Sequence, residues 1–360
     1  MEITGNKISL YFLITIILIC VCSIIDWQIS NSNLTIPFLI AGILSIFGTT
    51  WSIPKFKSLK LKQIIREEGP ASHFEKSGTP TMGGLIIVPI GLIVGNLSTI
   101  NSNNYLSIIL ISGITISYMI IGCLDDLTSF KKNSNTGLSP NKKIILQSLA
   151  ALGFIYLSTK AQLISSSINL EFGHYVDIGL LIWPLALFVL LAESNATNLT
   201  DGLDGLAAGC GALVLAGLAF EITIRGSNVD QTLASFSIAL SGAWLGFLFQ
   251  NKKPAKIFMG DTGSLALGAS ISGIALISNN LLILLIMGGV FFAESLSVII
   301  QVSIFKISKK ISGYGKRVFL MAPLHHHYEL TGVGEEKIVK NFLIATGVLV
   351  LLGLLIGSYT

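Results

Sequence analysis

The chain has 360 residues, of which 52% are hydrophobic and only 12% are charged. A typical soluble domain has about 25% charged residues, so this chain has too few ionisable side chains to cover a water-facing surface. Its mean hydropathy of +0.76 agrees with that conclusion. The composition therefore excludes a soluble enzyme, a disordered chain and a small secreted disulfide scaffold, and it predicts an integral membrane protein with many spans.

Eleven stretches have the length and apolar composition of a transmembrane helix, which needs about 17–25 residues. They cover residues 8–27, 36–53, 82–99, 106–124, 143–158, 178–194, 203–222, 232–249, 262–279, 281–304 and 341–357. The apolar runs are continuous rather than alternating, which favours a helical bundle over a β-barrel. We predict an all-α, polytopic transmembrane bundle that forms a single domain over residues 1–360, with 8–27 as a retained helix rather than a signal peptide.

Positive charge is distributed very unevenly among the segments that connect these spans. Four segments hold 20 of the 23 lysines and arginines, namely 54–81, 125–143, 250–261 and 305–340. Lysine and arginine stay on the cytoplasmic side of a membrane protein. Counting the spans alternately puts all four segments on one side, together with the uncharged loop 195–202. We therefore expect the N-terminus in the cytoplasm and the C-terminus outside.

Three aspartates at this side are candidate functional groups, because a charge within a transmembrane helix costs about 2.5–3.5 kcal/mol. Asp125 and Asp126 follow the span 106–124. Neighbours on a helix point about 100° apart, so one could hold a metal while the other takes a proton or orients a substrate. Asp261 lies between glycines at the start of the span 262–279. The alternatives are a solvated helix end for the pair and a helix cap for Asp261.

Four polar residues, Asn195, Asn198, Asp201 and Asp204, follow one another at intervals of three. That spacing lines one face of a helix, whereas the two Asp-Gly pairs favour turns. In either conformation the segment offers amides and carboxylates that suit a polar head group.

Three consecutive histidines, His325, His326 and His327, lie in the last basic segment. Adjacent residues rarely chelate one ion together, so zinc fits poorly, whereas imidazole N–H groups suit a diphosphate. A solvated tract is the alternative. Glu193 and Glu294 lie within predicted spans, where they could pair helices or have a functional role.

The sequence contains no Walker loop and no dinucleotide-binding glycine motif, and we expect no nucleic-acid partner. Acids, amides, histidines and lysines instead gather at one membrane face. That combination suits Mg²⁺-assisted phosphoryl transfer, in which oxygen ligands and cations neutralise diphosphate charge.

Five motifs carry a resemblance to a known family: EEGPASHFEKSGTPTMGG, LDD, SNATNLTDGLDGLA, FMGDTGSLALG and MAPLHHHYEL, spread from Glu67 to Leu330. With these the chain resembles the phospho-N-acetylmuramoyl-pentapeptide transferases, a branch of the polyprenyl-phosphate N-acetylhexosamine-1-phosphate transferases. The resemblance implies transfer of phospho-MurNAc-pentapeptide from UDP-MurNAc-pentapeptide to undecaprenyl phosphate, giving lipid I and UMP for peptidoglycan synthesis. It also implies Mg²⁺, a multi-pass protein of the bacterial cytoplasmic membrane, and an active site facing the cytoplasm.

The family's functional residues carry over onto matching positions of this sequence. By the resemblance, Asp125, Asp126, Asp261 and His325 are catalytic, and Asp261 is also the metal ligand. The implied substrate-binding residues are Lys76, Thr81, Lys143, Asn195, Asn198, Asp201, Asp204, Phe258, Gln301 and His326. The active site would then be built from segments around 67–84, 125–143, 195–204, 258–264 and 316–330.

The sequence departs from the family in one feature of its architecture. Members usually have ten spans, so segment 8–27 is expected to be either an additional N-terminal helix or a more hydrophobic form of an N-terminal helix. A homodimer is a further expectation. Two alternative functions are a transferase of GlcNAc-1-phosphate, against which the histidine motif argues, and a membrane transporter. Transporters place their polar groups near the midplane, whereas here these groups gather at one face.

Overall fold

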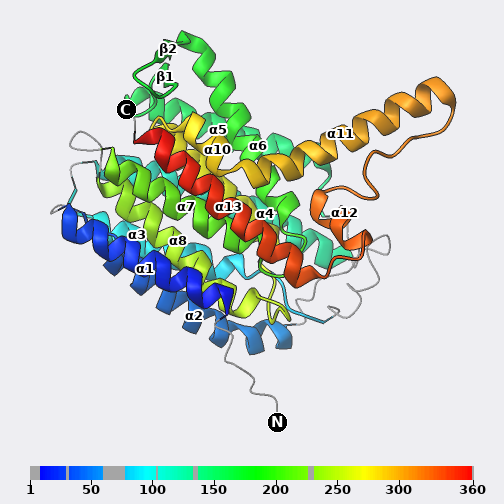
Figure 1. The fold of residues 1–360 in the computed structure, drawn as a ribbon, viewed down its shortest axis with the longest axis horizontal. Helices are drawn as coiled ribbons and strands as arrows, with labels where there is room; N and C mark the ends of the chain where they lie inside the picture. The colour runs from blue at the N-terminus through cyan, green and yellow to red at the C-terminus, as the bar shows by residue number, and fades with distance from the viewer. Residues whose placement is uncertain are drawn as a thin grey trace.

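The computed structural model describes residues 9–29, 32–59, 78–102, 104–132, 137–225 and 231–358 of the chain. Over these ranges the chain forms thirteen α-helices and one short β-hairpin (Figure 1). The helices are α1 (Leu10–Gln28), α2 (Thr35–Ser58), α3 (Gly84–Thr99), α4 (Tyr105–Lys132), α5 (Pro140–Lys160), α6 (Ile182–Thr200), α7 (Leu206–Ile224), α8 (Gln231–Asn251), α9 (Gly260–Ile277), α10 (Leu281–Met287), α11 (Gly289–Ser312), α12 (Leu324–Leu330) and α13 (Glu335–Gly357). The hairpin pairs β1 (Ser167–Asn169) with β2 (Tyr175–Asp177), and the 3₁₀ helix η2 (Gly179–Leu181) precedes α6.

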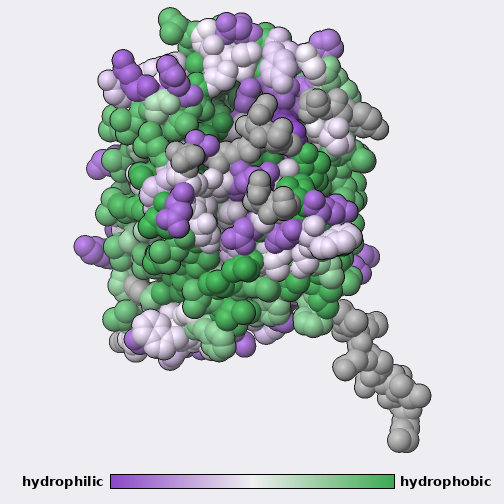
Figure 2. All heavy atoms as spheres, turned by 90° about the vertical axis from the view of Figure 1, so that its left-hand side faces the viewer, coloured by the Kyte–Doolittle hydropathy of each residue, from purple (hydrophilic) through white to green (hydrophobic). Residues whose placement is uncertain are grey.

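The predicted all-α membrane bundle is confirmed. Within the described residues, nine helices are long and apolar enough to cross a membrane, and α3 is a shorter apolar helix of 16 residues. Each of the eleven predicted ranges coincides with helix, including 8–27, which corresponds to α1. Hydrophobic side chains cover large areas of the face shown in Figure 2, as expected of helices that contact lipid.

The prediction of one continuous span over 281–304 is wrong. The helix breaks at Gly288, between α10 and α11, and α11 continues to Ser312. Glycine is a poor helix former, and the adjacent Gly288 and Gly289 weaken the helix at this point. Lys306, Lys309 and Lys310 are polar residues with a high helix propensity, so α11 continues beyond the end of the apolar stretch.

Contacts between loops show that the helices bring several connecting segments to one end of the bundle. The N–H of Gly83 donates to the Phe258 carbonyl (2.9 Å), and the N–H of Gly205 donates to Asn251 Oδ1 (3.0 Å). The start of α1 reaches the same end, since Lys252 Nζ lies 5.9 Å from the Tyr11 ring centre. We call this the site end, and its described connecting segments are 78–83, 137–139, 201–205, 252–259 and 313–323.

Glycines set a very close contact between α9 and its two neighbours, α3 and α4. A Cβ added to Gly122 of α4 would lie 2.1 Å from the Asp261 carbonyl oxygen, and one added to Gly84 of α3 would lie 2.2 Å from the Gly263 nitrogen. Small residues at helix interfaces in membranes allow this backbone approach. The contact holds the α4 residues after Gly122 against the first turn of α9.

Ion pairs with buried carboxylates hold together the opposite end of the helix bundle. Arg225, which follows α7, donates to Glu171 of the hairpin at 2.9 Å and pairs with Glu221 of α7 at 2.9 Å. The Glu171 and Glu221 side chains are buried, so loss of the arginine would leave uncompensated charges. Figure 1 shows the hairpin and α12 beyond opposite ends of α13.

Candidate active site

Asp126 of α4 caps the N-terminus of α9. Its carboxylate accepts hydrogen bonds from the N–H of Asp261 (3.1 Å), the N–H of Thr262 (3.0 Å) and the Thr262 hydroxyl (2.6 Å). These N–H groups have no acceptor inside their own helix, and a negative charge is favourable beside them. Because α4 continues to Lys132, the alternative of a solvated helix end is wrong for this aspartate pair.

Lys143 of α5 brings two carboxylates together. Its ammonium is paired with Asp261 Oδ2 and lies 4.0 Å from Asp125 Oδ1. Asp125 and Asp261 thus lie on either side of this ammonium, and Asp125 also accepts from the Leu138 N–H at 3.1 Å. Asp261 lies in the first turn of α9 and does not cap it, so the capping alternative is also wrong. The result is a cluster of two acids around one cation.

Helix α6 supplies amides to this cluster. Asn198 Nδ2 donates to Asp261 Oδ1 (2.8 Å) and to Ser264 Oγ (2.9 Å). Asn195, one turn earlier, donates to Gln147 Oε1 of α5 at 3.1 Å. Both asparagines therefore lie on one helix face, as the spacing predicted, and Asn198 directly orients the Asp261 carboxylate.

Asp201 and Asp204 lie beyond the end of α6, in the turn that the Asp-Gly pairs favoured. Asp204 is buried and joins three segments: its Oδ2 accepts from the Ala255 N–H (3.0 Å), and its N–H donates to Glu335 Oε1 (3.0 Å). Glu335 also pairs with Lys253 at 2.9 Å and, through that hydrogen bond, raises the pKa of Lys253. These contacts give Asp204 a role in fastening the α6–α7 turn.

Thr81 and Phe258 lie on two adjacent segments at the start of α9. The N–H of Phe258 donates to the Pro80 carbonyl at 2.8 Å. Gly260 follows with φ +71°, and a Cβ there would lie 2.6 Å from Asp126 Oδ2 and 3.0 Å from Thr81 Oγ1. Glycine is therefore required at this position both for its conformation and for space. Thr81 and Phe258 thus border the aspartate cluster.

The three histidines have three different partners. His325 is fully buried, and its Nδ1 lies 3.1 Å from Glu294 Oε2. His326 Nδ1 lies 2.7 Å from a carboxylate oxygen of Glu329. His327 Nδ1 accepts from the N–H of Leu320 at 3.2 Å. A solvated tract is therefore wrong for His325, and His327 serves to hold the preceding loop.

Gln301 holds the loop that leads to these histidines. Its Oε1 accepts from the N–H groups of Val318 (2.9 Å) and Phe319 (3.0 Å), and its Nε2 donates to the Phe319 carbonyl (3.0 Å). The remaining predicted residue, Lys76, lies outside the described residues.

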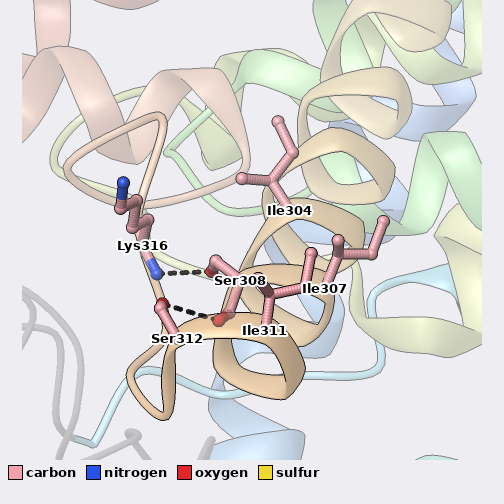
Figure 3. Close-up of a pocket in the computed structure, with 6 residues that line it drawn as sticks. All are labelled: Ile304, Ile307, Ser308, Ile311, Ser312 and Lys316. Carbon is pink, nitrogen blue, oxygen red and sulfur yellow. Dashed lines mark hydrogen bonds between the residues drawn. The ribbon is translucent and has the colours of Figure 1, made fainter.

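A separate groove lies along the end of α11, where the N–H of Lys316 donates to Ser308 Oγ at 2.7 Å (Figure 3). Its lining residues are Ile304, Ile307, Ser308, Ile311, Ser312 and Lys316. None of them was singled out as a site residue, although Lys316 begins the predicted site segment 316–330.

Sequence reasoning missed several residues of the cluster. Thr262 and Ser264 lie inside the FMGDTGSLALG motif, so the motif was the available signal. Gln147 lies one helical turn after Lys143, and that spacing could have revealed it. Glu335 lies just beyond the MAPLHHHYEL motif but 131 positions from Asp204, and nothing in the sequence indicated the contact between them.

Acids, amides and a lysine gather at one end of a polytopic helical bundle, and comparison with known proteins places the chain in a class of membrane transferase. Residues 108–279 match the family model described as Glycosyl transferase family 4. Residues 76–88 match signature 1 of phospho-N-acetylmuramoyl-pentapeptide-transferase.

Curated relatives identify the family within that class. The chain is 54% identical over 331 residues to the phospho-N-acetylmuramoyl-pentapeptide-transferase of Prochlorococcus marinus (strain MIT 9313), covering 92% of this chain and 89% of the relative. It is 53% identical to that of Synechococcus sp. (strain CC9605), covering 92% and 95%. It is 44% identical to that of Prochlorococcus marinus subsp. pastoris (strain CCMP1986 / NIES-2087 / MED4), covering 98% of both chains. The chain belongs to the phospho-N-acetylmuramoyl-pentapeptide-transferase family, which confirms the resemblance found in its motifs.

Proposed function

We propose that this chain transfers phospho-MurNAc-pentapeptide from UDP-MurNAc-pentapeptide to undecaprenyl phosphate, forming lipid I and UMP for peptidoglycan synthesis. The observation that carries the proposal is the convergence of Asp125, Lys143 and Asp261 from three helices at the site end. A lysine held between carboxylates, with amide donors beside it, suits the recognition of phosphate groups. Membership of the family supports the same substrates.

The geometry assigns different tasks to the charged groups of the cluster. In the reaction, an oxygen of the lipid phosphate bonds to the phosphorus that bears the sugar, and UMP leaves with the electron pair. Lys143 offsets negative charge on the phosphates. Asp125, which faces Lys143, orients the lipid phosphate and accepts its proton. Asp126 acts on the site indirectly, because its oxygens are engaged by the first turn of α9.

The donor set fits Mg²⁺. Asp125 and Asp261 converge on a cation, the Lys143 ammonium, so the space between the carboxylates already favours positive charge. Mg²⁺ prefers oxygen ligands and is usually held by one or two carboxylates, water and substrate phosphates. Asp261 would hold the ion with Asp125 beside it, and the ion would neutralise charge on the diphosphate.

The purified, full-length protein is expected to release UMP when given UDP-MurNAc-pentapeptide, undecaprenyl phosphate and Mg²⁺. An enzyme-coupled assay for UMP measures the rate of transfer. UDP-GlcNAc serves as the matched control donor and is expected to give no release. Efficient turnover of UDP-GlcNAc would instead support the GlcNAc-1-phosphate transferase, and no turnover with either donor would contradict the proposed function.

We also propose that the protein resides in the bacterial cytoplasmic membrane with its site end in the cytoplasm. The basic segments support this orientation. A second copy of the chain is a further proposed partner, which a native-mass measurement of the detergent-solubilised protein tests.

Cysteine labelling tests the proposed orientation. In a variant with Cys20 and Cys123 replaced by alanine, a cysteine at Lys310 is expected to be shielded from a membrane-impermeant reagent in intact cells. A cysteine at Asp177, in the hairpin of the opposite end, is expected to react. Both positions are exposed, so permeabilised cells should label both variants and serve as the control. The reverse pattern in intact cells would invert the orientation.

A further inference from the structure

Glu294 of α11 is buried, and its carboxylate contacts one residue, His325, at two points. One oxygen accepts the backbone N–H of His325 at 3.2 Å, and the other lies 3.1 Å from the Nδ1 of the same residue. Both side chains are fully buried. This bidentate contact fixes the start of α12 and the rotation of the imidazole ring together.

The contact also decides which ring nitrogen carries a proton. An ionised carboxylate only accepts hydrogen bonds, so the Nδ1 that faces it must be the donor. The tautomer of a histidine is set in this way by the partner of one nitrogen, which leaves the other nitrogen available for chemistry. Here the available nitrogen is Nε2.

The Nε2 of His325 is directed at the turn between α6 and α7. It would lie 2.3 Å from a Cβ added to Gly202, so it occupies the space that a side chain at this position would need. Nε2 is buried and has no hydrogen-bond partner among the described residues. Leaving such a group unsatisfied is unfavourable, so Nε2 has the capacity for one further hydrogen bond.

We propose that Glu294 is a positioning residue that fixes the Nδ1-protonated tautomer of His325 and aims Nε2 at the 201–205 turn, where it contacts the diphosphate end of the nucleotide substrate. This inference rests on the proposed function. Asn198, one turn before Gly202, donates to Asp261 and so connects this turn to the aspartate cluster. Ionised phosphate oxygens only accept hydrogen bonds, so Nε2 contacts the diphosphate as a donor, in the form of the ring that carries a proton on both nitrogens.

A double-mutant cycle with Glu294→Gln and His325→Ala tests the proposal. Glutamine cannot accept at both points, so the ring loses its fixed orientation. Each single variant is expected to lose about tenfold to a hundredfold in kcat/KM for UMP release, which corresponds to one hydrogen bond to a charged group. The double variant should lose no more than the worse single variant, because both changes remove the same function. Losses that multiply would overturn the proposal.

Glu193→Gln is the matched control. Glu193 is another membrane-embedded carboxylate, on α6, and its Oε1 has no partner among the described residues. The control should keep near-normal turnover. Turnover of Glu294→Gln within about threefold of the wild-type rate, with His325→Ala strongly impaired, would show that Glu294 does not act through His325.

A spectroscopic measurement separates failure of this inference from failure of the proposed function. In protein labelled with ¹⁵N-histidine, the signals absent from His325→Ala are assigned to His325. The wild type should show a protonated Nδ1, and Glu294→Gln should show a changed tautomer ratio. A wild-type His325 protonated at Nε2 alone would refute the positioning role even if the protein released no UMP. If Glu294→Gln does not fold, Gly202→Ala replaces it: its methyl group should displace Nε2 and lower turnover, and full activity would refute the proposal.

Discussion

Replacing Asp261 by asparagine is expected to lower the rate of UMP release by roughly two to four orders of magnitude. Asp261 accepts from Lys143 and from Asn198, and it is the proposed ligand of Mg²⁺. Asparagine has nearly the same shape, so packing should survive, but the charge that holds both cations is lost. The rate is measured at saturating concentrations of both substrates.

The matched control is Asp177→Asn, which removes an exposed carboxylate at the opposite end of the bundle and should leave turnover unchanged. A second readout does not depend on activity: Mg²⁺ should raise the melting temperature of the wild type and of the control, and raise it less in Asp261→Asn. Near-normal turnover in Asp261→Asn would contradict the assignment of Asp261 as the metal ligand.

Replacing Asp126 by asparagine is expected to damage the fold as well as the rate. Three donors converge on the Asp126 carboxylate, two backbone N–H groups and the Thr262 hydroxyl. An amide offers one acceptor and places its own N–H groups against the remaining donors. The cost is about 1–3 kcal/mol of stability for the unsatisfied group, together with the lost interaction of a charge with the helix terminus. Thermal unfolding in detergent measures the effect.

Asp125→Asn is the matched control, because it removes the same charge from the neighbouring residue without removing the cap of α9. Its carboxamide oxygen can still accept from the Leu138 N–H, so its melting temperature should stay close to the wild-type value while turnover falls. Equal melting temperatures for Asp126→Asn and the wild type would show that the cap contributes little to stability.

The spans and the end of the bundle that carries the site could be predicted from the sequence, because both depend on local composition. A span needs a run of apolar residues, and four connecting segments carry the lysines and arginines that mark their side of the membrane. The break at Gly288 could not be predicted from hydropathy, since the apolar run continues across it. Its signal was conformational, a pair of adjacent glycines.

The partners of the site residues could not be read from the sequence. Asp126 meets Thr262, which is 136 positions away in the chain, and only helix packing determines that pairing. The family resemblance implied Gln301 as a site residue, although it lies in none of the motifs, and the structure shows its side chain bound to the backbone of Val318 and Phe319. Adjacent histidines look equivalent in sequence, yet His325 and His327 differ because α12 turns them toward different neighbours.

Gly122 has no side chain to take part in chemistry, yet the aspartate cluster depends on it. It lies one helical turn before Asp126, and its missing Cβ lets the α4 backbone touch the Asp261 carbonyl. A single methyl group there would widen the gap between two helices, lengthening the bonds of Asp126 to α9 and separating Asp125 from Asp261. In a survey of inactivating substitutions, Gly122 would therefore rank with the aspartates, although the defect would be one of spacing and not of charge.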